Sequence, residues 1–131
     1  MNQVVVITGL AQGMGRQVAK MLAQSGDTIA GFDMNQADLD SLSKELTAIG
    51  GDHLLEPINI LDRDKILAFR DRVMEKYNRV DIVLSNIGIG FFGPFEETDL
   101  AKAAQCIEIN VMGTAAVFQA FIPAMRENKK F

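Results

Sequence analysis

The segment Thr8-Gly9-Leu10-Ala11-Gln12-Gly13-Met14-Gly15 decides the fold of this 131-residue chain. It follows an apolar run, residues 4–7, that predicts a buried strand. It leads into Met14, Val18 and Leu22, which are apolar residues at helical spacing. A strand, a glycine-rich turn and a helix in this order bind the pyrophosphate of a dinucleotide. Glycines let backbone N–H groups approach the pyrophosphate, and the helix N-terminus carries positive partial charge.

Strand and helix patterns alternate along the rest of the chain. Apolar runs predict further strands over residues 28–33, 53–60 and 80–85. Apolar residues at helical spacing predict helices over residues 39–49, from Asp62 to Tyr77, and from about Thr98 onward. This βαβαβαβα pattern, without a linker or a repeat, predicts one α/β domain over residues 1–131, a Rossmann-type three-layer α/β/α arrangement with a parallel sheet. Right-handed crossovers favour the strand order 3-2-1-4.

Local signals predict the ends and the faces of these helices. Gly50-Gly51 is expected to end the second helix, Asp62 to cap the third at its start, and Asn78 to close it in a left-handed conformation. Pro123 is expected to kink or weaken the last turns of the long helix. The residues expected to face inward from that helix are Ile107, Val111, Phe118, Ile122 and Met125.

The predicted strand order places a crevice between the first and the fourth strand, where the order reverses. Ligands of open parallel sheets bind in such a crevice, at the carboxyl ends of the strands. The glycine-rich turn, Asp33, Asn59 and the turn at residues 85–88 all fall on this edge. Asp33 lies 18 residues after Gly15, at the end of the second predicted strand. Four segments that are distant in sequence therefore predict one ligand site.

Charge and composition argue against two kinds of partner. The net charge is −4 and the isoelectric point is about 4.9, and the basic cluster is confined to Arg126 and Lys129-Lys130. A broad basic face is therefore absent from the sequence, and nucleic-acid binding is not expected. No apolar run approaches the roughly 18 residues of a membrane helix, so no membrane partner is expected.

The chain has one cysteine, Cys106, and one histidine, His53. A single cysteine cannot form an internal disulfide, which fits a reducing compartment, and we expect a cytoplasmic protein. Cys106 stands at an apolar position of the long helix and is expected to be a small buried side chain, and His53 to lie at the surface before a strand. Without a cluster of cysteine and histidine, a metal site is not indicated.

Three motifs resemble the short-chain dehydrogenase/reductase family. The pattern T-G-x-x-x-G-x-G at residues 8–15 resembles the family's cofactor loop. Residues 81–88, Asp-Ile-Val-Leu-Ser-Asn-Ile-Gly, resemble its D-(I/V)-L-V-N-N-A-G motif, and Asn110 within residues 109–113 matches a third. The resemblance covers the whole chain but only the first half of a typical member. It implies an oxidoreductase that transfers hydride between a nicotinamide cofactor and an alcohol or ketone.

The resemblance also implies which residues bind the cofactor. Gly9, Gly13 and Gly15 match the phosphate-binding glycines, with Gln12 and Met14 offering backbone contacts to phosphate or ribose. Asn59 and Ile60 begin the stretch that matches D-V-T-D, whose first residue contacts the adenine amino group. Asn86 and Gly88 match residues beside the nicotinamide ribose. Ile87 is bulkier than the family's usual alanine, which bears on how the nicotinamide end fits.

Asp33 decides the expected cofactor, since it matches the acidic residue that holds the adenosine ribose. A carboxylate accepts hydrogen bonds from both ribose hydroxyls of NAD and repels the 2′-phosphate of NADP. Gln12 and Met34 stand where NADP-preferring relatives often carry a basic residue. We therefore expect NAD rather than NADP. The alternative for Asp33 is a carboxylate that caps a helix or serves the loop alone.

The catalytic half of the family's chemistry is not matched by this sequence. Asn110 matches the helix asparagine that supports a proton-relay water and the catalytic lysine, although a purely structural amide is the alternative. The family's Tyr and Lys lie four residues apart, whereas no lysine follows the single tyrosine, Tyr77, at that spacing. This 131-residue chain alone is therefore expected to be inactive.

The fourth strand is expected to be an exposed apolar edge. We expect either a fragment of a longer enzyme or a chain whose edge is covered by a partner, and a homo-oligomer in either case. Two other functions remain open, a non-catalytic NAD-binding protein that self-associates and a nucleotide-binding domain of another class, such as a methyltransferase. Phe91, Phe92 and Phe95 are expected either to line an apolar substrate pocket or to pack under a loop.

Overall fold

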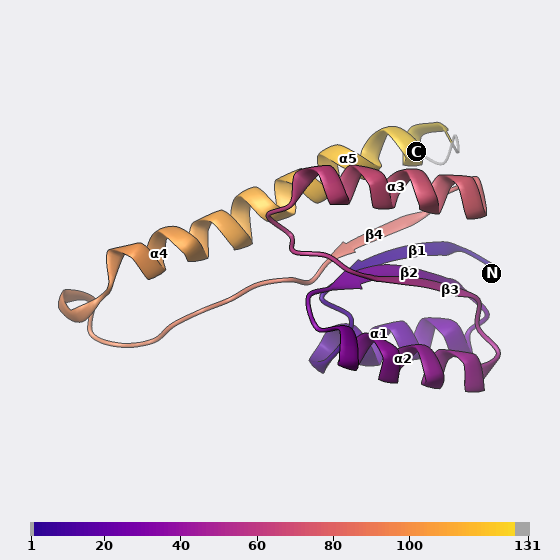
Figure 1. The fold of residues 1–131 in the computed structure, drawn as a ribbon, viewed down its shortest axis with the longest axis horizontal. Coiled ribbons are helices and arrows are strands. Elements are labelled where there is room, and N and C mark those ends of the chain that lie inside the picture. Colours follow the sequence, from indigo (N-terminus) through magenta and orange to yellow (C-terminus); the bar gives the residue numbers. More distant parts are fainter. Residues whose placement is uncertain (1, 128–131) are drawn as a thin grey trace.

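Four parallel strands form one sheet in the order β3-β2-β1-β4, which confirms the predicted order (Figure 1). In this computed structural model, which describes residues 2–127, the strands are β1 (Val4–Thr8), β2 (Thr28–Asp33), β3 (His53–Pro57) and β4 (Ile82–Ser85). β1 lies at the centre, where its residue Val5 pairs with Ile29 of β2 on one side and with Ile82 of β4 on the other.

Helices cover both faces of the sheet, as the alternating pattern predicts. α1 (Gly13–Gln24) and α2 (Gln36–Ile49) lie on one face, and α3 (Arg63–Tyr77) and α5 (Thr114–Glu127) lie on the other (Figure 1). α4 (Leu100–Ile107) and a π-helical segment, η2 (Glu108–Gly113), run into α5 as one continuous helix that projects beyond the sheet. A short 3₁₀ turn, η1 (Phe95–Glu97), precedes α4.

Two apolar cores fill the spaces between the sheet and its helices. On the α3 and α5 side, the rings of Phe32 and Phe69 lie 5.6 Å apart, and those of Phe69 and Phe121 lie 6.3 Å apart, both edge to face. On the α1 and α2 side, the core residues include Ile7, Leu10, Ala19, Leu42 and Leu46. The carboxyl ends of the strands are thereby held rigidly beside the glycine-rich turn.

The predicted helix ends are confirmed. Gly50 ends α2 with φ of 86°, and Asn78 ends α3 with φ of 55°, both in the left-handed region. The carboxylate of Asp62 accepts a hydrogen bond from the N–H of Lys65 and so caps α3.

Two strand boundaries differ from the prediction. β3 ends at Pro57 rather than at Ile60, because the chain turns at Asn59, whose side-chain oxygen accepts from the N–H of Leu61. β4 begins at Ile82 rather than at Val80. Just before it, the N–H of Asp81 donates a hydrogen bond to the carbonyl of Val4. Apolar character alone extended both predicted strands into the adjoining turns.

Of the five residues predicted to face inward from the long helix, Met125 packs against the core, and the other four positions are wrong. Ile107 and Val111 are 61% and 57% exposed, because α4 and η2 project past the sheet and no described element packs on them. In α5 the buried residues are Val117, Ala120, Phe121 and Ala124, whereas Phe118 and Ile122 are partly exposed. The π-helical segment adds residues to its turn and shifts the phase between the two halves. The helix continues through Pro123 to Glu127.

Among the described residues, β4 is an edge strand, as expected: it pairs with β1 on one side and has no strand on the other. Beside it, Val83, Phe118, Ile122 and Met125 line an open apolar cavity together with Arg126. The basic residues Lys129 and Lys130 lie outside the described residues.

One helix, Leu100–Glu127, is long and apolar enough to cross a membrane by length and composition, contrary to the expectation from apolar runs. Length and composition do not separate a membrane span from a core helix. The α5 part of this helix packs Val117 and Phe121 into the core beneath α3.

Candidate functional site

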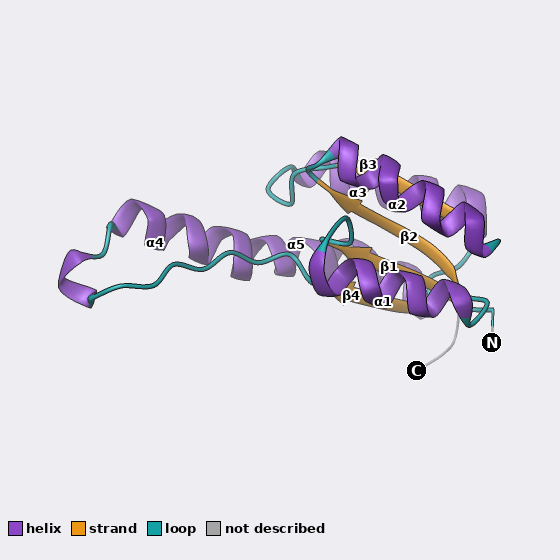
Figure 2. Ribbon diagram, turned by 90° about the horizontal axis from the view of Figure 1, so that it is seen from below, coloured by secondary structure: helices purple, strands orange, loops and turns teal. Residues whose placement is uncertain are grey.

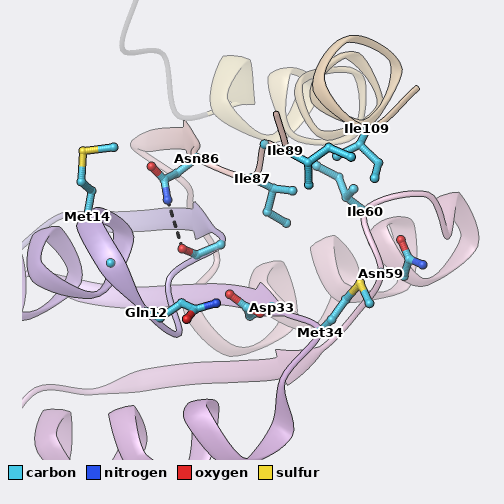
Figure 3. Close-up of a pocket in the computed structure, with 13 residues that line it drawn as sticks. Gln12, Met14, Asp33, Met34, Asn59, Ile60, Asn86, Ile87, Ile89 and Ile109 are labelled. Atoms are coloured by element: carbon cyan, nitrogen blue, oxygen red, sulfur yellow. Dashed lines mark hydrogen bonds between the residues drawn. The ribbon is translucent and has the colours of Figure 1, made fainter. Parts of the chain in front are cut away.

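A cavity of about 350 Å³ opens at the carboxyl ends of β1, β2 and β4 (Figure 3). Ten of the eleven predicted cofactor-binding residues line it: Gly9, Gln12, Gly13, Met14, Asp33, Asn59, Ile60, Asn86, Ile87 and Gly88. The eleventh, Gly15, lies beneath the turn in the first residues of α1. The structure therefore brings four distant segments to one site, at the crevice that the strand order predicts.

The glycine-rich turn needs glycine for two different reasons. Gly9 and Gly13 have φ of 67° and 57°, in the left-handed region that side chains disfavour. A Cβ on Gly15 would lie 2.3 Å from the carbonyl oxygen of Gly9 and 2.7 Å from Nδ2 of Asn86. Gly15 therefore lets α1 begin directly against the turn.

Thr8 and Asn86 tie the glycine-rich turn to the turn that follows β4. The buried hydroxyl of Thr8 accepts hydrogen bonds from the N–H groups of Asn86 and Ile87, at 3.0 and 3.3 Å. The side-chain amide of Asn86 donates to the carbonyl of Gly9 at 3.0 Å (Figure 3). That Thr8 joins the two turns was not predicted from the sequence, where Thr8 was named only as the first residue of the glycine-rich motif.

Asp33 ends β2 with its carboxylate held by two backbone groups. Oδ2 accepts from the N–H of Ala11 at 3.2 Å, and Oδ1 accepts from the N–H of Asn35 at 3.3 Å. The cap of α2 is Asn35, whose side chain accepts from Asp38, so the helix-capping alternative for Asp33 is wrong. Each carboxylate oxygen keeps a further lone pair for a ligand in the cavity.

The other side of the cavity is apolar. Ile60, Ile87, Ile89 and Ile109 gather there, opposite Gln12 and Asp33 (Figure 3). Ile87 packs closely over the turn. If Gly9 carried a Cβ, that atom would lie 2.9 Å from the Ile87 side chain. Sequence reasoning missed Ile89 and Ile109, although each stands one or two residues from a motif position.

The side chain of Asn59 stabilises a local turn. Its side chain is exposed, and the oxygen expected to contact adenine already accepts from the N–H of Leu61 at 3.0 Å. A second lone pair on that oxygen is left for a ligand.

Asn110 lies in η2 and holds the loop after β4 with both ends of its amide. Oδ1 accepts from the N–H of Ile89, and Nδ2 donates to the carbonyl of Ile89, both at 2.8 Å. Cys106, one turn earlier, is partly exposed rather than buried, and its thiol donates to the same carbonyl at 3.2 Å. The side chain of Asn110 therefore fixes the cavity wall at Ile89.

Replacing Asn110 with leucine is expected to release this loop. Two hydrogen bonds to the Ile89 backbone are lost, at about 1 kcal/mol each, so exchange of the Ile89 amide hydrogen should accelerate about 10- to 100-fold. Nuclear magnetic resonance hydrogen exchange measures this rate. Cys106→Ala is the control: it removes the thiol's contacts with the Ile89 carbonyl and with Nδ2 of Asn110, both at 3.2 Å, but leaves the two bonds from Asn110 to Ile89. Equal rates in the two variants would contradict the assignment.

The loop from β4 to α4 runs beside the projecting helix, away from the sheet (Figure 2). Phe91, Phe92 and Phe95 lie on this loop and in η1, and all three are exposed. They do not line this cavity, and their exposure shows that packing under the loop is wrong for them, whereas the substrate pocket stays a prediction.

The remaining titratable residues singled out in the sequence lie away from the cavity. The Tyr77 hydroxyl donates to the carboxylate of Asp52 at 3.4 Å, and burial raises the pKa of that phenol. His53 is the first residue of β3 and is partly buried, with Nε2 2.7 Å from the hydroxyl of Ser43. Over residues 2–127, no three His, Cys, Asp or Glu side chains gather as metal ligands.

Comparison with known proteins identifies relatives along nearly the whole chain. The family model described as short chain dehydrogenase matches residues 3–130. The 3-oxoacyl-(acyl-carrier-protein) reductase FabG of Thermotoga maritima is 32% identical over 127 residues, which cover 95% of this chain and 50% of that enzyme. The chain spans about half the length of such relatives.

Solved structures share the fold. The alcohol dehydrogenase of Thermococcus sibiricus, complexed with 5-hydroxy-NADP, superimposes with a TM-score of 0.91 at 26% identity, over 97% of this chain and 55% of that one. An NAD-bound short chain dehydrogenase of Mycobacterium paratuberculosis gives a TM-score of 0.93 at 23% identity, over 98% of this chain and 52% of that one. Proteins of this fold thus bind either dinucleotide.

Proposed function

The chain belongs to the short-chain dehydrogenase family, and on that premise we propose that its cavity binds a nicotinamide dinucleotide, with NAD preferred over NADP. The protein would then be the cofactor-binding part of an oxidoreductase that acts on an alcohol or ketone. The observation that carries the proposal is the hydrogen-bonded joining of the glycine-rich turn to Asp33 and to Asn86 around one cavity.

The residues at the cavity fit such a cofactor. Because Gly15 has no Cβ, α1 can begin against the turn. Its first N–H groups then lie where a pyrophosphate would bind. Asp33 would accept the adenosine ribose hydroxyls with its free lone pairs. On the opposite wall, Ile60 would offer apolar surface to the adenine ring, and Ile87 would lie toward the nicotinamide end. The bound cofactor would supply the hydride chemistry.

We propose that the 131-residue chain alone does not turn over substrate. The family's reaction uses a tyrosine that transfers a proton and a lysine that lowers its pKa. Tyr77 contacts Asp52 instead and does not line the cavity. Asn110 holds Ile89 with its side chain, so we assign it a supporting role at the cavity wall.

Replacing Asp33 with alanine tests the proposed cofactor preference. NADH should bind about tenfold more weakly, because charged hydrogen bonds to the ribose are lost, while NADPH should lose less or gain. Fluorescence titration gives both dissociation constants. Asp40→Ala removes the same charge from an exposed site on α2 and should leave both constants unchanged. If both constants were also unchanged in Asp33→Ala, the ribose role would be refuted.

The other two functions are less well supported. A non-catalytic NAD-binding protein is not favoured, because the matched relatives are dehydrogenases and reductases. A methyltransferase also places glycines after its first strand, and displacement of NADH by S-adenosylmethionine would favour that class instead.

A further inference from the structure

Arg16 stands next to Gly15 in the first turn of α1 and does not line the cavity, yet its side chain is only 16% exposed. Its guanidinium donates to the carbonyl of Ala11 at 2.7 Å, within the glycine-rich turn. On α2 it donates to the carbonyl of Asp38 at 3.3 Å, to the hydroxyl of Ser41 at 2.8 Å and to the carboxylate of Glu45 at 2.7 Å. One side chain therefore joins the turn to the helix that follows Asp33.

Ala11 connects Arg16 with Asp33. The carbonyl of Ala11 accepts from Arg16, and the N–H of Ala11 donates to Oδ2 of Asp33. Ala11 itself is fully buried, so its two polar groups have no access to water as substitute partners. The position of the Asp33 carboxylate thus depends on where Arg16 holds Ala11.

We propose that Arg16 is a positioning residue that fixes the Asp33 carboxylate for the adenosine ribose and so contributes to cofactor selectivity. This inference rests on the proposed function, since it assumes that the cavity binds a dinucleotide. The side chain of Arg16 acts through Ala11 and forms no hydrogen bond with any of the predicted cofactor-binding residues. Its charge is paired with Glu45, which leaves it unsuited to attract a 2′-phosphate.

The chemistry of arginine suits this position. A guanidinium presents five N–H donors in a rigid planar fork, so it can serve a carbonyl and a carboxylate at once. A lysine at position 16 has a single ammonium group, which cannot serve the Ala11 carbonyl and the three acceptors of α2 together.

Lys20 provides a matched comparison one turn further along α1. Its ammonium lies 2.6 Å from the other oxygen of Glu45 and, within residues 2–127, forms no hydrogen bond with the glycine-rich turn. Lys20 and, to a lesser degree, Arg16 hold the pKa of the Glu45 carboxyl below its usual range, so that carboxylate stays charged at neutral pH. Replacing Lys20 therefore removes one positive charge and one ion pair with Glu45, as replacing Arg16 does, but it leaves the hydrogen bond to Ala11 in place.

The test compares Arg16→Met, Arg16→Lys and Lys20→Met in the full chain. We expect Arg16→Met to raise the dissociation constant for NADH about tenfold and that for NADPH less, which lowers the selectivity ratio. Arg16→Lys, which retains the charge and guards against a variant that fails to fold, should lower the ratio too. Lys20→Met should keep the wild-type ratio. Fluorescence titration gives these constants.

A second measurement is independent of the cofactor. Hydrogen exchange of the Ala11 amide in the protein without ligand should accelerate in both Arg16 variants and stay at the wild-type rate in Lys20→Met. Equal effects of the Arg16 and Lys20 variants on the NADH-to-NADPH selectivity ratio and on Ala11 exchange would overturn the inference. Arg16 would then be only an ion-pair partner of Glu45. A wild-type protein that bound neither dinucleotide would overturn the proposed function instead, and Ala11 exchange would still decide whether Arg16 holds the turn.

Discussion

Replacing Gly15 with alanine should weaken NADH binding about 100-fold, which corresponds to about 2.7 kcal/mol of binding free energy. The added Cβ would lie 2.3 Å from the carbonyl oxygen of Gly9 and 2.7 Å from Nδ2 of Asn86, both closer than a Cβ approaches a non-bonded heavy atom. α1 must move away from the turn, and the hydrogen bond between Asn86 and Gly9 must break or lengthen. The proposed pyrophosphate site and the junction with the turn after β4 are therefore disturbed together.

Gly26→Ala is the control for this substitution. Gly26 follows the other end of α1, away from the cavity, with φ of 88°, and a Cβ there meets no atom within 4 Å. The control should lose only about 1–2 kcal/mol of stability to left-handed backbone strain. Titration with NADH and thermal unfolding of both variants give the comparison. Equal loss of binding in both would show that the close approach of α1 to the turn does not explain the effect.

Replacing Phe69 with alanine should reduce the free energy of unfolding by about 3–5 kcal/mol, the usual loss for a fully buried phenylalanine. Phe69 is completely buried in α3, and its ring contacts those of Phe32 and Phe121. The variant leaves a cavity between the sheet and two helices. The melting temperature should fall by about 10 °C or more in a domain of this size.

Phe92→Ala is the control for this second substitution. Phe92 is fully exposed on the loop after β4, so its removal should leave the melting temperature within a few degrees of the wild type. Calorimetry or circular dichroism provides the measurement. A small effect at Phe69 would mean that the two faces of the core collapse to fill the space, and would contradict the rigid packing described above.

Much of the fold could be predicted because its determinants are local in the sequence. The apolar run before Gly9 predicted β1, and residues such as Gly50, Asp62 and Asn78 predicted helix ends through the backbone conformations they favour. The strand order followed from the handedness of crossover connections. The position of Asp33 at the end of β2 then placed it at the crevice.

The contacts that shape the site could not be predicted in the same way. The bonds from Asn110 to Ile89 and from Arg16 to α2 join residues that are 21 to 29 positions apart. No local pattern encodes such a pair. The inward position of Ile107 and Val111 was predicted wrongly because α4 and η2 project past the sheet, which an apolar repeat in the sequence does not indicate.

The central place of β1 in the sheet also affects the order in which the molecule forms. Val5 pairs with Ile29, which is 24 residues away, and with Ile82, which is 77 residues away. Closing the longer loop costs about 1 kcal/mol more chain entropy than closing the shorter one. During synthesis, the first three strands can therefore assemble before β4 has left the ribosome. The crevice, which exists only between β1 and β4, is then the last part of the sheet to be completed.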